Sequence, residues 1–158
     1  MDGCERPQAL LVWMALSEVL ARGRVRVDRA LQQRAGLTLA DTLVLCQVAL
    51  APGGRLRMVD IADRLGIGKS AVTKTVDRLE RRGWVVRQRP GLDRRTVHAT
   101  LAPTGAEVFR SARPVFVAAV TRELTGPLTG AELGELRRLV GKLLGGGASL
   151  PGAVLAPI

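Results

Sequence analysis

The chain has 158 residues, a length suited to one compact domain or to one small domain extended by dimerising helices. Lysine and arginine outnumber aspartate and glutamate by 24 to 14, and the net charge of +10 favours acidic partners such as nucleic acid. The apolar run ALLVWMAL at 9–16 is too short to cross a bilayer, and no basic secretory region precedes it. These features exclude a membrane protein and predict a cytoplasmic one.

Two cysteines and a single histidine offer little for a metal or disulfide site. Cys4 and Cys46 lack the spacing of metal ligands, so reduced thiols are the plain interpretation. His98 has no cysteine or paired carboxylate beside it in the sequence. We therefore expect no metal and no cofactor.

The first half of the chain is patterned as helices. Apolar residues at helical spacing over 8–33 predict one long helix, or one kinked at Gly23. A second helix over 37–50 has Thr38 as its N-cap and stops at the APGG of 51–54. A short extended piece at 55–58 leads to two more helices, which are joined by a turn at Gly66 and end at Gly83.

In the second half of the chain, the spacing of apolar residues changes from the helical period of about 3.6 to the strand period of about 2. WVVRQR (84–89) and TVHATL (96–101) predict two strands of a hairpin with PGLDR at its tip. Helices over 103–124 and 129–144 follow, with Thr104 and Thr129 as N-caps and Pro114 as a kink or break. The predicted fold class is mainly α with a small β-hairpin.

Ala62, Gly66 and Val72 have the spacing of a helix-turn-helix. The small residue lets the second helix pack closely, the glycine permits a left-handed turn, and the branched residue enters the core. Two helices of a bundle could share this pattern, which is the alternative interpretation. The charge distribution favours the first, because nine basic residues and only three acidic ones lie between Lys69 and Arg95.

The second helix of the pair separates apolar from polar side chains. Val72, Val76 and Leu79 share one face, and the opposite face carries Ser70, Thr73, Lys74, Asp77 and Arg81. Short hydroxyl side chains near the helix start let a DNA duplex come close, while lysine and arginine hold phosphates. An ordinary solvated face, the alternative, would carry more glutamate.

The hairpin tip adds a second basic group. Arg94 and Arg95 lie beside Asp93 at the end of two short strands. Arginine on an extended tip suits the DNA minor groove, where negative potential is concentrated. In isolation, the tip would be explained as a turn kept soluble by charge.

This order of elements resembles the MarR family of bacterial transcription regulators. The similarity covers roughly residues 8–145, and RLRMVDIADRLGIGKSAVTKTVDRLERRGWVVR with DRRTVHATLAPTG carries it. It implies a dimerisation helix at 1–36, a winged helix-turn-helix lobe at 37–101, C-terminal dimerisation helices at 102–145 and a loosely ordered tail at 146–158. The implied DNA contacts are Lys69, Ser70, Ala71, Thr73, Lys74, Arg78, Asp93, Arg94 and Arg95.

The resemblance also implies a function. A homodimeric repressor would bind a pseudo-palindromic double-stranded DNA operator and leave it when a small aromatic or anionic molecule binds. By element position, the candidate residues for that effector are Trp13, Met14, Phe109, Arg113 and Phe116. Aromatic and apolar residues at helical spacing more often belong to a core or a dimer interface, which is the alternative interpretation.

Other functions remain open at this stage. They are a winged-helix module that binds only proteins, and a regulator that senses oxidants through a cysteine. An enzyme is the weakest alternative, because GIGKS at 66–70 lacks the first glycine of a phosphate-binding loop and position 63 is Asp63.

Overall fold

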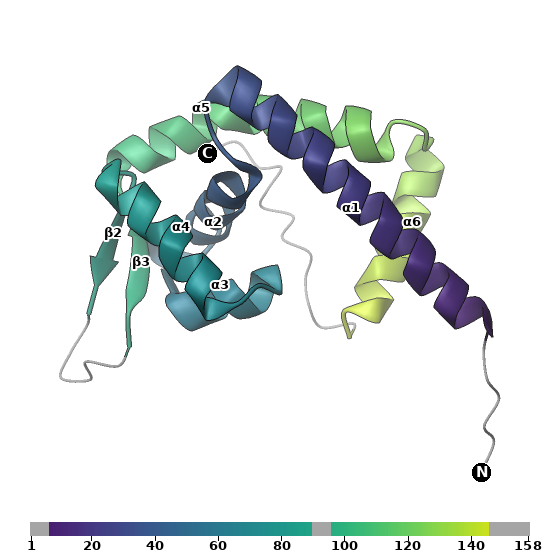
Figure 1. Cartoon of the computed structure of the whole chain (residues 1–158), viewed down its shortest axis with the longest axis horizontal. Coiled ribbons are helices and arrows are strands. Elements are labelled where there is room, and N and C mark those ends of the chain that lie inside the picture. The colour runs from purple at the N-terminus through teal and green to yellow at the C-terminus, as the bar shows by residue number, and fades with distance from the viewer. Residues whose placement is uncertain (1–6, 90–95, 146–158) are drawn as a thin grey trace, which may run out of the picture.

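The computed structural model describes residues 7–89 and 96–145 and confirms a mainly helical fold with a small antiparallel sheet (Figure 1). The predicted tail at 146–158 lies outside the described residues. In chain order the elements are α1 (Pro7–Ala35), α2 (Leu39–Ala49), the 3₁₀ turn η1 (Pro52–Gly54), β1 (Arg55–Arg57), α3 (Met58–Leu65), α4 (Lys69–Arg81), β2 (Val85–Gln88), β3 (His98–Leu101), α5 (Pro103–Val120), the π-helical turn η2 (Thr121–Thr125) and α6 (Gly130–Leu143).

Helix α1 is continuous, so Gly23 does not end it. Gly23 is buried where α1 meets η2, and a Cβ there would lie 3.3 Å from Cδ1 of Leu124. The missing side chain therefore serves close packing between the two segments. The helix ends before Gly36, whose φ of 65° belongs to the left-handed region that glycine adopts readily.

The predicted caps are confirmed for two helices. Thr38 caps α2 and exchanges hydrogen bonds with Asp41, while Thr129 caps α6 and does the same with Glu132. Because Thr129 donates to the Glu132 carboxylate from both its backbone and its hydroxyl, the pKa of Glu132 is lowered.

Two predictions for α5 are wrong. Its N-cap is Ala102 and not Thr104, since Pro103 fits the first helical position, where an amide hydrogen has no helical partner. The Thr104 hydroxyl instead donates to the carbonyl of Gly83 at 2.6 Å. The helix also continues through Pro114 without a break, and the π-helical turn follows only at Thr121.

The helix-turn-helix and its sheet form as predicted, with one additional strand. Gly66 ends α3 with a φ of 62°, and the segment at 55–58 supplies β1 at the edge of the sheet. The strand order is β1-β3-β2, with Leu56 opposite Ala99 and Val86 opposite Thr100. The wing is therefore attached to the strand that leads into α3.

The described residues form two regions with separate buried clusters. In the first, α2, α3, α4, the sheet and the start of α5 enclose a core that includes Leu45, Ile61, Val72 and Phe109; we call it the lobe. In the second, α1 runs alongside the later part of α5 and buries Leu31 there (Figure 1). Helix α6 contributes no buried residue.

None of the described helices is long and apolar enough to span a membrane.

Candidate nucleic-acid interface

The start of α4 presents a polar, accessible surface. Val72, Val76 and Leu79 are fully buried and attach the helix to the lobe. Lys69, Ser70, Ala71, Thr73 and Lys74, at the start of the helix, are all exposed. The sequence-predicted contact face is therefore accessible over the first two turns of the helix.

Small side chains dominate this surface. The Thr73 hydroxyl donates to the carbonyl of Lys69 at 3.0 Å, which leaves its oxygen lone pairs directed outward as acceptors. Lys69 and Lys74 form no ion pair with the described part of the chain. Both ammonium groups are thus available to an anionic partner.

A basic hollow of about 460 Å³ lies beside this surface. Its lining comes from the α3 start, α4 and the sheet, and comprises Arg57, Met58, Val59, Thr73, Arg87, Arg89, Thr96 and Val97. Arg87 binds Asp77 and Glu80 and also donates to the carbonyl of Thr73 at 3.2 Å. These bonds join the wing to α4, so the two elements are held together.

Arg57 plays a comparable role at the start of α3. Its guanidinium donates twice to the Asp60 carboxylate, each at 2.7 Å, and this contact lowers the pKa of Asp60. The pair closes the first turn of α3, where the N-cap provides no side-chain hydrogen bond.

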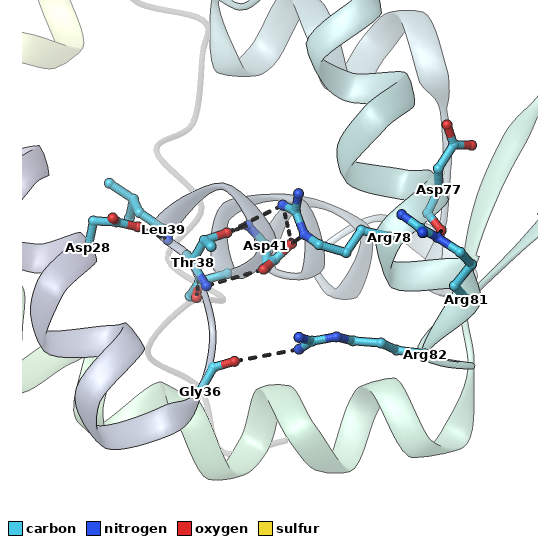
Figure 2. A network of polar contacts seen from close by, with 10 residues as sticks. Asp28, Gly36, Thr38, Leu39, Asp41, Asp77, Arg78, Arg81 and Arg82 are labelled. Carbon is cyan, nitrogen blue, oxygen red and sulfur yellow. Dashed lines mark hydrogen bonds and ion pairs between the residues drawn. The ribbon is translucent and has the colours of Figure 1, made fainter.

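The guanidinium of Arg78 does not point outward, whereas the prediction placed it near the DNA phosphates. Figure 2 shows its guanidinium turned toward the start of α2, where Nε and Nη2 donate to Oδ1 of Asp41 at 2.9 and 2.6 Å. Nη2 also lies 3.4 Å from the Thr38 hydroxyl. The reason is that Asp41 is only 1% exposed and its charge requires a partner.

Arg82 forms a second contact that the sequence analysis missed. Its guanidinium lies 4.8 Å from the centre of the Trp84 ring, and Nη1 lies 3.5 Å from the carbonyl of Gly36 (Figure 2). No local pattern indicates this contact, because the carbonyl belongs to the turn after α1. Thr38, by contrast, was predicted as a cap from its place at the start of the helix, and the structure adds Asp41 as its capping partner.

The wing tip cannot be placed, since Asp93, Arg94 and Arg95 lie outside the described residues. The strands β2 and β3 that lead to it are paired through Gln88 and His98. The Nδ1 atom of His98 is buried and has no hydrogen-bond partner among the described atoms. The described residues contain no group of three or more potential metal ligands.

The five candidate effector residues are not brought together. Trp13 and Met14 are exposed near the start of α1, at 70% and 59%. Phe109 is buried in the lobe core, and Arg113 is half-buried close enough to influence Cys46. Phe116 lines a hollow between helices.

That hollow, of about 140 Å³, lies where α1, α2, α5 and η2 meet. Its lining is almost wholly apolar and comprises Leu20, Gly23, Arg24, Val27, Leu39, Leu43, Phe116, Val120 and Leu124. A cavity of roughly this size accommodates a single aromatic ring. Arg24 is the one charged side chain in the lining.

Cys46 is a buried thiol with low reactivity. Burial raises its pKa, and the nearby positive charge of Arg113 only partly opposes that shift. Since the thiolate is the reactive form, the geometry gives no support to oxidant sensing at this residue. Cys4 lies outside the described residues.

A helix-turn-helix joined to a β-hairpin, with an exposed polar start to its second helix, defines a winged helix-turn-helix protein. A family model described as MarR family matches residues 35–96. The chain is 31% identical over 108 residues to the multiple antibiotic resistance protein MarR of Salmonella typhimurium, covering 68% of this chain and 74% of that protein. The chain belongs to the MarR family of transcriptional regulators.

Other relatives agree with this placement. The HTH-type transcriptional repressor MdtR of Bacillus subtilis is 31% identical over 111 residues, which is 70% of each chain. The solved structure of Sco3205, a MarR family transcriptional regulator from Streptomyces coelicolor in complex with DNA, is 34% identical, with a TM-score of 0.73 over 92% of this chain and 96% of that one. These relatives are regulators and not enzymes, as the sequence predicted.

Proposed function

We propose that this protein is a sequence-specific DNA-binding transcriptional repressor. The observation that carries the proposal is the start of α4, where Ser70, Thr73 and Lys74 are exposed while the buried valines of the same helix fix it to the lobe. Thr73 offers acceptor lone pairs and Lys74 offers donors, which are the groups that distinguish base edges in the major groove. The solved structure of Sco3205 in complex with DNA supports DNA binding by this protein.

The wing would supply the second contact. Arg95 would enter the minor groove, Asp93 would orient it, and Arg94 would bind backbone phosphates. Lys69 and Ala71 complete the proposed surface on α4. We leave Arg78 out, because its guanidinium is bound to Asp41. Binding of this kind would place the protein in the cytoplasm, where DNA is accessible.

The proposed DNA-binding form is a homodimer built by α1 and α6. Both helices expose large apolar side chains that the described chain does not cover: Leu10, Leu11, Val12, Trp13, Met14, Val19, Leu133, Leu136, Leu139 and Leu143. Large apolar side chains left exposed in this number along two helices support an interface there. Two-fold symmetry then predicts a pseudo-palindromic operator with half-sites about one helical turn apart.

Repression would be relieved by a small ligand in the apolar hollow beside Phe116. The hollow suits one aromatic ring, and Arg24 could meet an anionic substituent at its edge. The site touches both α1 and α2, so it lies between the proposed dimer helices and the lobe. The name of MdtR, a transcriptional repressor, supports repression over activation.

A gel-shift titration with the upstream DNA of the protein's own gene, at two salt concentrations, tests the central proposal. We expect tight binding at low salt, with log K falling by about 0.9 per phosphate contact as log salt rises. Binding with no salt dependence would contradict the contact surface, and no binding at either salt would favour the protein-binding module.

A further inference from the structure

Four basic residues of α4 and its C-cap form two pairs with different surroundings. Lys69 and Lys74, near its start, form no ion pair with the described residues. Arg78 and Arg82, one turn apart at its end, are both directed at the corner between α1 and α2 (Figure 2). Positive charge that would otherwise be assigned to DNA binding is therefore engaged by contacts within the protein.

The contacts at this corner join three helices in series. Asp28 of α1 accepts a hydrogen bond from the amide of Leu39, the first residue of α2, at 2.6 Å. One turn later Asp41 accepts the Thr38 amide on Oδ2 at 3.1 Å and the Arg78 guanidinium on Oδ1. The chain of bonds thus runs from the proposed dimer helix, through the start of α2, to the end of α4.

Helix capping alone does not account for a buried carboxylate at position 41. The cap requires only an acceptor for the Thr38 amide, which a neutral side chain could supply. A buried charge carries a large desolvation cost that must be offset by a partner, and such pairs are retained in some proteins because they fix one arrangement. Here the arrangement fixed is that of α4 against α2.

The location of the pair makes it suited to orienting α4. Val72, Val76 and Leu79 hold the helix by apolar packing, which is not directional and resists rotation weakly. The charge-assisted bonds of Arg78 are directional. They lie eight residues beyond Ser70, about 12 Å along the helix, so a small rotation at Arg78 would displace the reading end.

We propose that Asp41 and Arg78 are positioning residues for operator binding, which set the orientation of α4 relative to α1 without touching DNA. The inference rests on the proposed DNA-binding function. It assigns to Asp41, an acidic residue, a favourable effect on binding to a polyanion. Arg82, through Gly36 and Trp84, provides a second attachment of the same corner.

Asp41 and Arg78 carry opposite charges, so a double-mutant cycle can test the proposal. Asp41→Asn, Arg78→Gln and the double variant are measured for operator affinity. Arg81→Gln serves as the comparison for an arginine on the exposed face of α4, whose guanidinium, within the described residues, donates to the carbonyl of Asp77. We expect each single variant to lose about tenfold and the double variant no more than either, with an unchanged salt slope.

A direct phosphate contact at Arg78 predicts the reverse pattern. Asp41→Asn would then leave affinity unchanged or raise it, because it removes a negative charge and frees the guanidinium. Arg78→Gln would reduce the salt slope by about one phosphate contact, and Arg81→Gln would resemble it. Either result would overturn the positioning role.

A measurement without DNA separates this proposal from the DNA-binding one. Spin labels on cysteines introduced at Gln33 of α1 and Lys74 of α4, in a Cys4→Ser background diluted with unlabelled chain, report the distance between the two helices. We expect the distance distribution to broaden in Asp41→Asn. An equally narrow distribution would refute the positioning role whatever the DNA result, whereas broadening in a protein that binds no operator would refute only the DNA-binding function.

Protein folding is checked by circular dichroism and thermal midpoint. Should Asp41→Asn fail to fold, Arg78→Gln carries both measurements, because the Arg78 side chain is 36% exposed and its replacement leaves no cavity sealed in the core. The same broadening and the same affinity loss at unchanged salt slope are then required of that variant alone.

Discussion

The lobe and the two arms of this protein differ in how completely they bury their apolar side chains. In the lobe, the apolar residues of α4 are removed from solvent by α2, α3 and the sheet. In the arms, which are the first half of α1 and the whole of α6, residues such as Leu11, Trp13 and Leu143 remain more than half exposed. The contrast shows that the lobe buries its apolar side chains within one chain, and it supports the proposed dimer, in which a second chain would cover the arms.

The largest effect is expected from opening the lobe core. Leu79→Ala should lower the free energy of unfolding by about 2–5 kcal/mol, because it removes a fully buried side chain and leaves a cavity. Chemical denaturation monitored by circular dichroism measures the loss. The matched change Leu143→Ala, on the exposed end of α6, should stay within about 0.5 kcal/mol in the monomer. Equal losses would erase the distinction between the regions.

Substitutions in the arms should change the affinity of dimerisation and not the stability of the folded chain. Leu136→Ser is expected to weaken dimerisation by about 3 kcal/mol, because a symmetric interface loses two copies of the side chain. Analytical ultracentrifugation gives the dimer dissociation constant. A dimer of unchanged affinity would show that α6 is not part of the interface.

On the outer surface of the lobe, Lys74→Ala should reduce operator affinity by about 2 kcal/mol and relax base selectivity. Lys142→Ala removes the same charge from an exposed position on α6 and should have little effect. Competition gel shifts with altered operators measure both quantities. If only the salt slope changes, Lys74 contacts phosphate and does not read bases.

The smallest expected effect comes from the wing. Arg95→Ala should cost about 1 kcal/mol of operator affinity and leave the unfolding transition in place, since a single minor-groove arginine adds to binding but not to the core. Fluorescence anisotropy with labelled operator measures the change. Unchanged affinity would remove the wing from the mechanism.

Local patterns predicted the elements well where neighbours in the chain decide the structure. Thr38 and Thr129 were identified as caps because each is a threonine at the start of a helical pattern, and Glu132, three positions after Thr129, completes the second cap. Thr104 has the same spacing to Glu107 but is not a cap, because Pro103 starts the helix earlier. Similarly, the strand at 55–57 could be predicted as extended, whereas its pairing with β3 could not.

The predictions for the candidate site also divide into those that local spacing decides and those that it does not. The exposed start of α4 followed from the spacing of three buried residues, and the structure agrees with it. The surroundings of the proposed effector residues did not follow from spacing, because position along a helix does not specify which neighbour covers a side chain. Phe109 and Phe116 are seven residues apart on α5, yet one is buried in the lobe core and the other lines the hollow beside α1.

The sequence by itself determined the helices, the turn at Gly66, the apolar face of α4 and the family, because all of these depend on residues within a few positions of one another. The tertiary structure alone decided what Arg78 of α4 contacts within the protein. Arg78 pairs with Asp41, 37 positions away, because packing of α2 against α4 brings a buried carboxylate to it. No local pattern could reveal that a guanidinium suited to phosphate is already bound within the protein.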